Sequence, residues 1–169
     1  VPDAETLEPA AAALANLIRA CQVPAFFCDP KIHSWLVLQG LRHWKAHGPS
    51  ASLVASLCST SLLLSNELRH ARASYEVARH LVKVGEARSY EPATSWARHV
   101  FVLSCAPWFE PIDECVPYSL RAREGLLQSG DLQGASFTYY AATCLVLDCG
   151  QTLETISAEV EAGLAFEAR

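Results

Sequence analysis

The sequence has few basic residues and little charge overall. Lysine occurs only three times, and the 13 Lys and Arg residues are scattered among 18 Asp and Glu, which gives a formal net charge of −5. A nucleic-acid surface needs clustered Lys and Arg to displace the counterions of phosphates. We therefore expect no nucleic-acid partner.

The pattern of apolar residues shows no long uninterrupted run. The longest, around residues 139–147, falls short of the roughly 18 to 20 residues that a membrane-spanning helix needs. Asp3 and Glu5 precede an alanine-rich stretch, and this acidic start is the wrong charge for a secretory signal. These features predict a soluble, cytoplasmic chain with no membrane partner.

Several catalytic and cofactor motifs are also missing. The chain has no Gly-x-Ser-x-Gly elbow and no Gly-rich loop that ends in Gly-Lys-Ser or Gly-Lys-Thr, so it lacks the signatures of an α/β-hydrolase nucleophile and of a P-loop. None of the seven cysteines forms a Cys-x-x-Cys pair. An odd number of cysteines in a chain that is 51% hydrophobic favours reduced core thiols over a disulfide framework. We expect no catalytic residue, no metal and no cofactor.

Helices account for the patterns that are present. No stretch alternates with period two long enough to indicate a β-strand, whereas apolar residues recur at three- and four-residue spacing along most of the chain. The predicted helices cover residues 3–21, 31–47, 50–65, 67–84, 93–105, 112–129, 132–147 and 152–168. Residues 23–30, with two prolines and two adjacent phenylalanines, are predicted to connect the first two helices.

A repeat is suggested by the starts of the third, fifth and seventh helices, which fall near Ser50, Glu91 and Leu132 at intervals of 41 residues. Gly85-Glu86 and Gly130-Asp131 are predicted to end one helical pair and begin the next. Pairs of this length that bury their apolar faces against neighbours form an α-solenoid. The sequence predicts an all-α fold, a TPR-like α–α superhelix of about four helical pairs in one domain over residues 1–169. The alternative is a closed eight-helix globule.

Two polar clusters have the spacing of functional sites. His43 and His47 lie four residues apart, as two metal ligands on one helix face would, but Trp44 stands where a zinc protease has glutamate. Glu110, Asp113 and Glu114 could form an acid/base pair, but acids at the start of a helix also complement its dipole. The structural interpretation is favoured for both clusters.

Cysteine nucleophiles need a base and an activating environment. Cys58, Cys105, Cys144 and Cys149 all fall in apolar helical patterns. Packing in the core is therefore the favoured interpretation.

Aromatic residues give the remaining functional signal. In a solenoid the first helix of each pair often lines the concave face, which would bring one set of side chains to a groove. The candidate binding residues are Trp96, Arg98, His99, Tyr139 and Tyr140. Of the two tyrosines, one is expected to pack between repeats and the other to face the groove.

Three segments stand out in their order along the chain: Val-Pro-Ala-Phe-Phe at 23–27, Trp-Phe-Glu-Pro at 108–111, and Ser-Gly-Asp-Leu at 129–132 before a Tyr-rich helix. Together they resemble the helical-repeat region of large bacterial signalling proteins with a STAND/AAA-type ATPase module. In that family the repeats lie between an ATPase module, often preceded by a kinase-like domain, and a GAF domain with a histidine kinase or similar output. The resemblance implies a regulatory arm that senses a ligand or partner, and it carries over no catalytic residue.

The sequence therefore predicts a non-catalytic helical-repeat scaffold within a signalling protein. Its expected partners are other domains of the parent protein, a protein or peptide, or a small-molecule inducer. The start at Val1 without Met and the end at Arg169 inside a helical pattern predict a fragment of a longer chain. The alternative is a compact all-α small-molecule-binding domain or enzyme with an internal pocket.

Overall fold

The computed structural model describes residues 8–168, which form helices and turns without a β-strand. The fold is therefore all-α, as the spacing of the apolar residues predicts. The long helices are α1 (Pro9–Cys28), α2 (Pro30–His47), α5 (Ala71–Ala87), α6 (Ala93–Ser104), α7 (Ile112–Gln128), α8 (Leu132–Asp148) and α9 (Leu153–Glu167). Residues 3–7 of the predicted first helix lie outside the described part of the chain.

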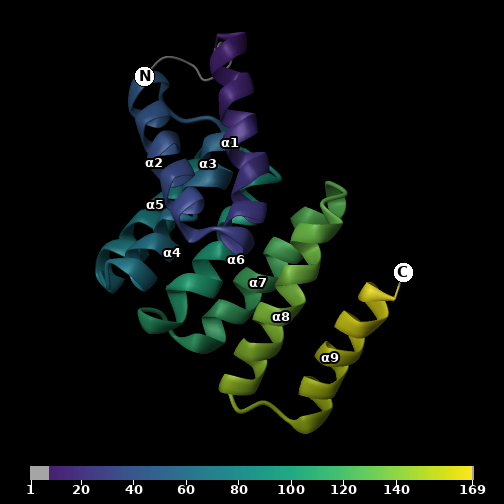
Figure 1. The fold of residues 1–169 in the computed structure, drawn as a ribbon. Coiled ribbons are helices and arrows are strands. Elements are labelled where there is room, and N and C mark those ends of the chain that lie inside the picture. Colours follow the sequence, from purple (N-terminus) through teal and green to yellow (C-terminus); the bar gives the residue numbers. More distant parts are fainter. Residues whose placement is uncertain (1–7, 169) are drawn as a thin grey trace.

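The helices pack mainly in chain order. One row of contacts joins α1 to α3 (Ala51–Leu57), α3 to α6, and α6 to α8, and we call these four helices the first row. The other long helices, α2, α5, α7 and α9, each pack against one or two members of that row. In Figure 1, α1 and α2 lie at one end of the molecule and α9 lies at the other.

The hydrophobic core is centred where α3, α5 and α6 meet. Leu53 and Val54 of α3 and Phe101 of α6 are buried, and Tyr75 of α5 packs its ring 5.7 Å from that of Phe101. Ala78 of α5 is also fully buried and lets the helices approach closely. This cluster fixes the middle of the first row and so positions α1 and α8 on either side of it.

The first helix does not end before Pro24, as the sequence predicts, but runs to Cys28 with Pro24 inside it. Residues 23–28 are therefore helical, and Asp29 is the only residue between α1 and α2. The Asp29 carboxylate accepts hydrogen bonds from the amides of Lys31 and Ile32 and caps α2. An interior proline removes one helical hydrogen bond. Burial of Ala25, one residue further on, helps to offset that cost.

The predicted single helix over residues 50–65 is also broken. α3 ends at Leu57, a turn follows, and α4 (Thr60–Leu62) leads into the π-helix η2 (Leu63–Glu67). Side chains in this segment bind nearby backbone carbonyls: the Cys58 thiol donates to Ala55 and the Ser61 hydroxyl donates to Cys58. Such bonds compete with the helical ladder, which explains why a Ser-rich helical pattern is interrupted here.

Glycine has two different roles at the predicted boundaries. Gly130 has a φ of +77° and ends α7, and Asp131 caps α8 by accepting from the amide of Gly134 at 2.9 Å. Gly85, in contrast, lies inside α5, and the residue of positive φ beyond that helix is Ser89. The prediction that Gly85 ends its helix is therefore wrong.

Within residues 8–168, one helix is long and apolar enough to cross a membrane by length and composition alone. It is α1, with a mean hydropathy of 1.4 over an 18-residue window. Asn16, Arg19 and Gln22 interrupt its apolar pattern, so α1 holds no uninterrupted apolar run of that length, and it is a candidate because Pro24 does not end the helix. In the structure α1 packs against α2 and α3.

Candidate functional site

A pocket of about 910 Å³ lies between the C-terminal half of α1, the middle of α6 and the N-terminal half of α8. Three of the predicted groove residues, Trp96, His99 and Tyr140, are among the residues that line it. The other two, Arg98 and Tyr139, lie elsewhere.

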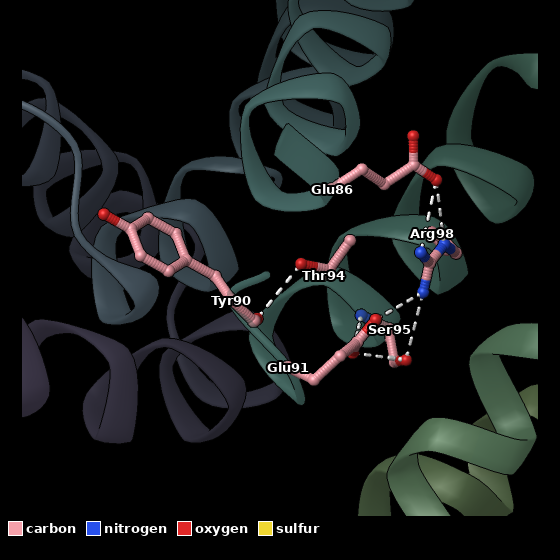
Figure 2. Close-up of polar contacts among 6 residues, drawn as sticks. All are labelled: Glu86, Tyr90, Glu91, Thr94, Ser95 and Arg98. Carbon is pink, nitrogen blue, oxygen red and sulfur yellow. Dashed lines mark hydrogen bonds and ion pairs between the residues drawn. The ribbon is translucent and has the colours of Figure 1, made fainter. Parts of the chain in front are cut away.

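Arg98 is held on the side of α6 that faces α5. Its guanidinium binds Glu86 at 3.2 Å and Glu91 at 2.7 Å, as Figure 2 shows. Glu91 also accepts hydrogen bonds from the amide and hydroxyl of Ser95. Partial burial acts to raise the pKa of Glu91, but the bonds from Ser95 and Arg98 outweigh it and lower that pKa. Arg98 therefore joins α5 to α6 and is not free to bind a ligand.

The two adjacent tyrosines of α8 point in different directions. Tyr139 packs against Phe166 of α9 at 5.2 Å between ring centroids, and the Arg123 guanidinium of α7 lies 3.7 Å from its ring centroid. Arg123 also forms an ion pair with Glu159 of α9. Tyr140, one residue on, is 67% exposed and lines the pocket. Tyr139 is thus the packing residue and Tyr140 the groove residue.

An aromatic cluster forms one wall of the pocket. Phe137 of α8 lies 6.1 Å from Phe27 of α1 and 6.3 Å from Trp96 of α6, measured between ring centroids. Its ring is nearly parallel to that of His99, at an interplanar angle of 13° and a distance of 6.4 Å. Phe137 therefore touches both neighbouring helices and connects the walls of the pocket.

His99 contributes an uncharged imidazole to this wall. It is 3% exposed, and burial lowers its pKa from 6.5 to about 4. Its Nδ1 atom is shielded from solvent and has no hydrogen-bond partner. Burial also lowers the pKa of His33, which lines the pocket from α2 and packs edge-on against Phe26. Both histidines are therefore neutral at pH 7.

Gln22 of α1 is a second buried polar residue in the lining. It is 4% exposed, and its Nε2 amide has no hydrogen-bond partner. A buried polar group without a partner costs about 1 to 3 kcal/mol. Pro24 lacks an amide hydrogen, so the carbonyl of Ala20 also loses its usual helical donor, and both residues line the same pocket.

The charged lining residues form a pair at the rim. Arg19 of α1 lies 3.5 Å from Asp131, the N-cap of α8. No other Lys, Arg, Asp or Glu is among the described lining residues. The pocket is thus apolar and aromatic, with a few polar atoms and no net charge.

Sequence reasoning missed Gln22 and Phe137 as lining residues. A signal existed for each of them. Gln22 follows Ala11, Ala15 and Ile18 at the spacing of buried positions on α1, so a polar side chain stands where the helix pattern requires an apolar one. Phe137 lies three residues before Tyr140, on the same helix face. Phe26 and Phe27, which the sequence placed in a connector, belong to α1 and are 42% and 67% exposed.

The other sequence candidates have structural partners. His43 is buried and its Nε2 lies 2.8 Å from the Ala11 carbonyl oxygen, while its ring packs 4.5 Å from that of His47. Among residues 8–168, no group of three or more His, Cys, Asp or Glu side chains is placed to hold a metal ion. Glu110 accepts a hydrogen bond from the Tyr75 hydroxyl at 2.8 Å.

The cysteines are free, and their environments differ. Cys58, Cys105 and Cys115 are buried, whereas Cys144 and Cys149 are partly exposed. Burial raises the pKa of the Cys58 thiol to about 12 and that of Cys115 to about 11. The thiolate is the reactive form, so these two thiols are poor nucleophiles at neutral pH.

No protein-family model, curated protein or solved structure matches the chain in comparisons with known proteins. The resemblance to helical-repeat regions of STAND/AAA-type signalling proteins therefore stays a prediction from the sequence. The function has to be argued from the pocket itself.

Proposed function

We propose that this protein is a non-catalytic α-helical-repeat domain that recognises a ligand in the pocket between α1, α6 and α8. The observation that carries the proposal is the wall of that pocket, where Gln22 and His99 are buried with polar atoms that have no partner. Ligand sites in proteins are typically apolar clefts of about 300 to 1,000 Å³ with a few well-placed polar groups. The pocket matches that description.

The order of helix packing supports the repeat part of the proposal. α3, α6 and α8 begin at Ala51, Ala93 and Leu132, and each is the first helix of a pair whose second helix packs against it. In α-solenoids each repeat packs on its neighbours, and the row of first helices lines a binding surface. The pocket lies along that row, which supports a TPR-like superhelix with its ligand on the inner face.

Binding is a better account of the pocket than catalysis. Among the hydrogen bonds of residues 8–168, none joins a hydroxyl or thiol to a lining histidine, which is the pairing that activates a nucleophile. The neutral histidines His33 and His99 pack against aromatic rings. We therefore assign the lining residues to recognition.

The proposed setting is a cytoplasmic signalling protein, as the sequence resemblance implies. In that setting the domain senses a small-molecule inducer or a peptide and passes the result to other domains of the parent protein. A ligand in the pocket touches both α1 and α8, so its binding can be transmitted through these two helices to the rest of the parent protein.

The experiment that tests recognition is NMR mapping with the ¹⁵N-labelled chain and a fragment set that contains neutral, anionic and cationic compounds, both aromatic and aliphatic. We expect shift changes to cluster at the amides of 19–27, 96–103 and 131–140. Phe137→Ala should abolish them, whereas Phe166→Ala, which removes an aromatic ring outside the pocket, should leave them in place. Shifts scattered over the surface, or no shifts at all, would contradict the proposed function.

Small-angle scattering tests the repeat arrangement separately. An open superhelix gives a curved, elongated particle, and a closed eight-helix globule gives a nearly spherical one. A nearly spherical particle would contradict the solenoid part of the proposal without affecting the ligand pocket.

A further inference from the structure

The chemistry of the pocket restricts what can bind in it, and this inference rests on the proposed function. Charge is the first restriction. Arg19 and Asp131 at the rim neutralise each other at 3.5 Å. A charged ligand buried here would find no free opposite charge among the described lining residues, and burying an unpaired charge is costly.

Shape is the second restriction. The Phe137 and His99 rings lie nearly parallel, and the Phe27 and Trp96 rings lie within 6.3 Å of Phe137. Aromatic rings prefer offset-stacked or edge-to-face contacts with other rings. A flat ligand therefore gains contacts with several walls at once, whereas a puckered aliphatic ring of the same size does not.

Hydrogen bonding is the third restriction. The Gln22 Nε2 amide is a buried donor without a partner. Gln22 lines the pocket from α1. Because Gln22 has several side-chain torsions, its amide can turn toward a bound molecule. A ligand edge that carries an acceptor satisfies this group.

We propose that the pocket takes an uncharged, planar aromatic molecule that presents a hydrogen-bond acceptor at its edge, as a primary aromatic amide or a neutral heterocycle does. Stacking on Phe137 supplies most of the contact area. Gln22 selects for the acceptor. Molecules of the same shape with a net charge are rejected.

The test is titration of the chain of residues 1–169 with 2-naphthamide, 2-naphthoate, 2-naphthamidine and cyclohexanecarboxamide, followed by NMR shifts at Phe137 and Trp96. 2-Naphthoate and 2-naphthamidine have the shape of 2-naphthamide but carry a charge. Cyclohexanecarboxamide is uncharged, like 2-naphthamide, but its ring is not flat. We expect 2-naphthamide to bind with a Kd about tenfold or more below that of either charged analogue, in line with the cost of an unpaired buried charge. Cyclohexanecarboxamide should bind more weakly than 2-naphthamide.

A variant pair tests the role assigned to the amide. Gln22→Leu should weaken 2-naphthamide about two- to tenfold, the range for one neutral hydrogen bond, and should not weaken 2-naphthamidine, whose cationic group has no acceptor. The matched control is Gln128→Leu on the exposed side of α7, which should change neither. The comparison of 2-naphthamide with its two charged analogues uses the original chain. It therefore tests the preference for an uncharged ligand even if Gln22→Leu does not fold.

The outcomes separate the two proposals. Equal or tighter binding of a charged analogue, with shifts at Phe137, overturns the inference about ligand class and leaves the recognition domain standing. If none of the four probes binds but other fragments map to the pocket, the inference about ligand class is also overturned and the recognition domain still stands. Failure of every fragment to map there overturns the recognition domain as well.

Discussion

A Cβ atom on Gly125 would lie 2.1 Å from the Ser95 hydroxyl oxygen and 3.0 Å from the Ser95 Cβ. Gly125 belongs to α7 and Ser95 to α6, so the absence of a side chain sets how closely these two helices approach. A related contact occurs on the other side of α6, where a Cβ on Gly85 would lie 2.5 Å from the Thr94 hydroxyl oxygen. Two adjacent residues of α6 thus pack against glycines from different helices.

Gly125→Ala is expected to destabilise the protein by up to about 2 kcal/mol. Alanine improves helix propensity by about 1 kcal/mol, but overpacking costs about 1 to 3 kcal/mol, and an overlap at 2.1 Å forces the backbones apart. Urea unfolding measures the change. In a chain that also carries Ser95→Gly, Gly125→Ala should lower the unfolding free energy by less. An equal loss with and without Ser95→Gly would contradict the steric explanation.

Asp131 is expected to act mainly as a helix cap. Asp131→Ala removes the bond to the Gly134 amide and should cost about 1 kcal/mol of stability. Asp131→Asn keeps the cap and removes only the ion pair with Arg19, which is partly exposed and so worth little. Thermal unfolding of both variants separates these effects. A large loss in Asp131→Asn would show that the ion pair matters more than the cap.

His99 makes stability depend on pH in a defined window. Its pKa is about 4 in the folded protein and ordinarily 6.5, so the unfolded chain takes up a proton first as the pH falls. The unfolding free energy should be undiminished above pH 6.5 and decrease by about 3 kcal/mol down to pH 4, with no further loss from this group below that. His33, whose pKa is also lowered, adds to the slope in the same direction.

The control for this pH dependence is His99→Phe, which keeps an aromatic ring and removes the titrating group. Denaturant unfolding between pH 4 and pH 7 should show a smaller slope in the variant than in the original chain. Identical slopes would mean that His99 does not remain buried and neutral in the folded protein.

The attachment of α9 is expected to depend on Arg123. Its side chain stacks on Tyr139 and pairs with Glu159, and both charged groups are mostly buried, with 12% and 15% of their side-chain surface exposed. Arg123→Ala leaves Glu159 without its partner, which should cost about 3 kcal/mol. Amide hydrogen exchange in 153–167 should become faster while exchange in α5 and α6 is unchanged. Arg121→Ala, on the exposed side of α7, is the matched control.

The sequence was sufficient to predict the helices but not all their ends. Apolar spacing identified the long helices because each one buries a face, and that periodicity is a local property of the chain. Pro24 and Gly85 were misread because both normally end helices. In the fold, Pro24 occupies an exposed position in α1, and Gly85 faces Thr94, so tertiary packing overrides the local preference.

The pocket was predictable only in part. Trp96, His99 and Tyr140 lie on helix faces that the repeat pattern directed toward a groove. The roles of Arg98 and Tyr139 depend on Glu86, Phe166 and other partners in neighbouring helices. Such pairings follow from the relative placement of helices, which no local pattern specifies.

The ion pair between Arg19 and Asp131, with the contact between Phe27 and Phe137 beside it, joins the beginning of the described chain to its last third. Most other packing in the molecule connects helices that are close in sequence. A molecule bound across these contacts would touch both ends of the first row at once, and so would link two helices that are otherwise joined through α3 and α6.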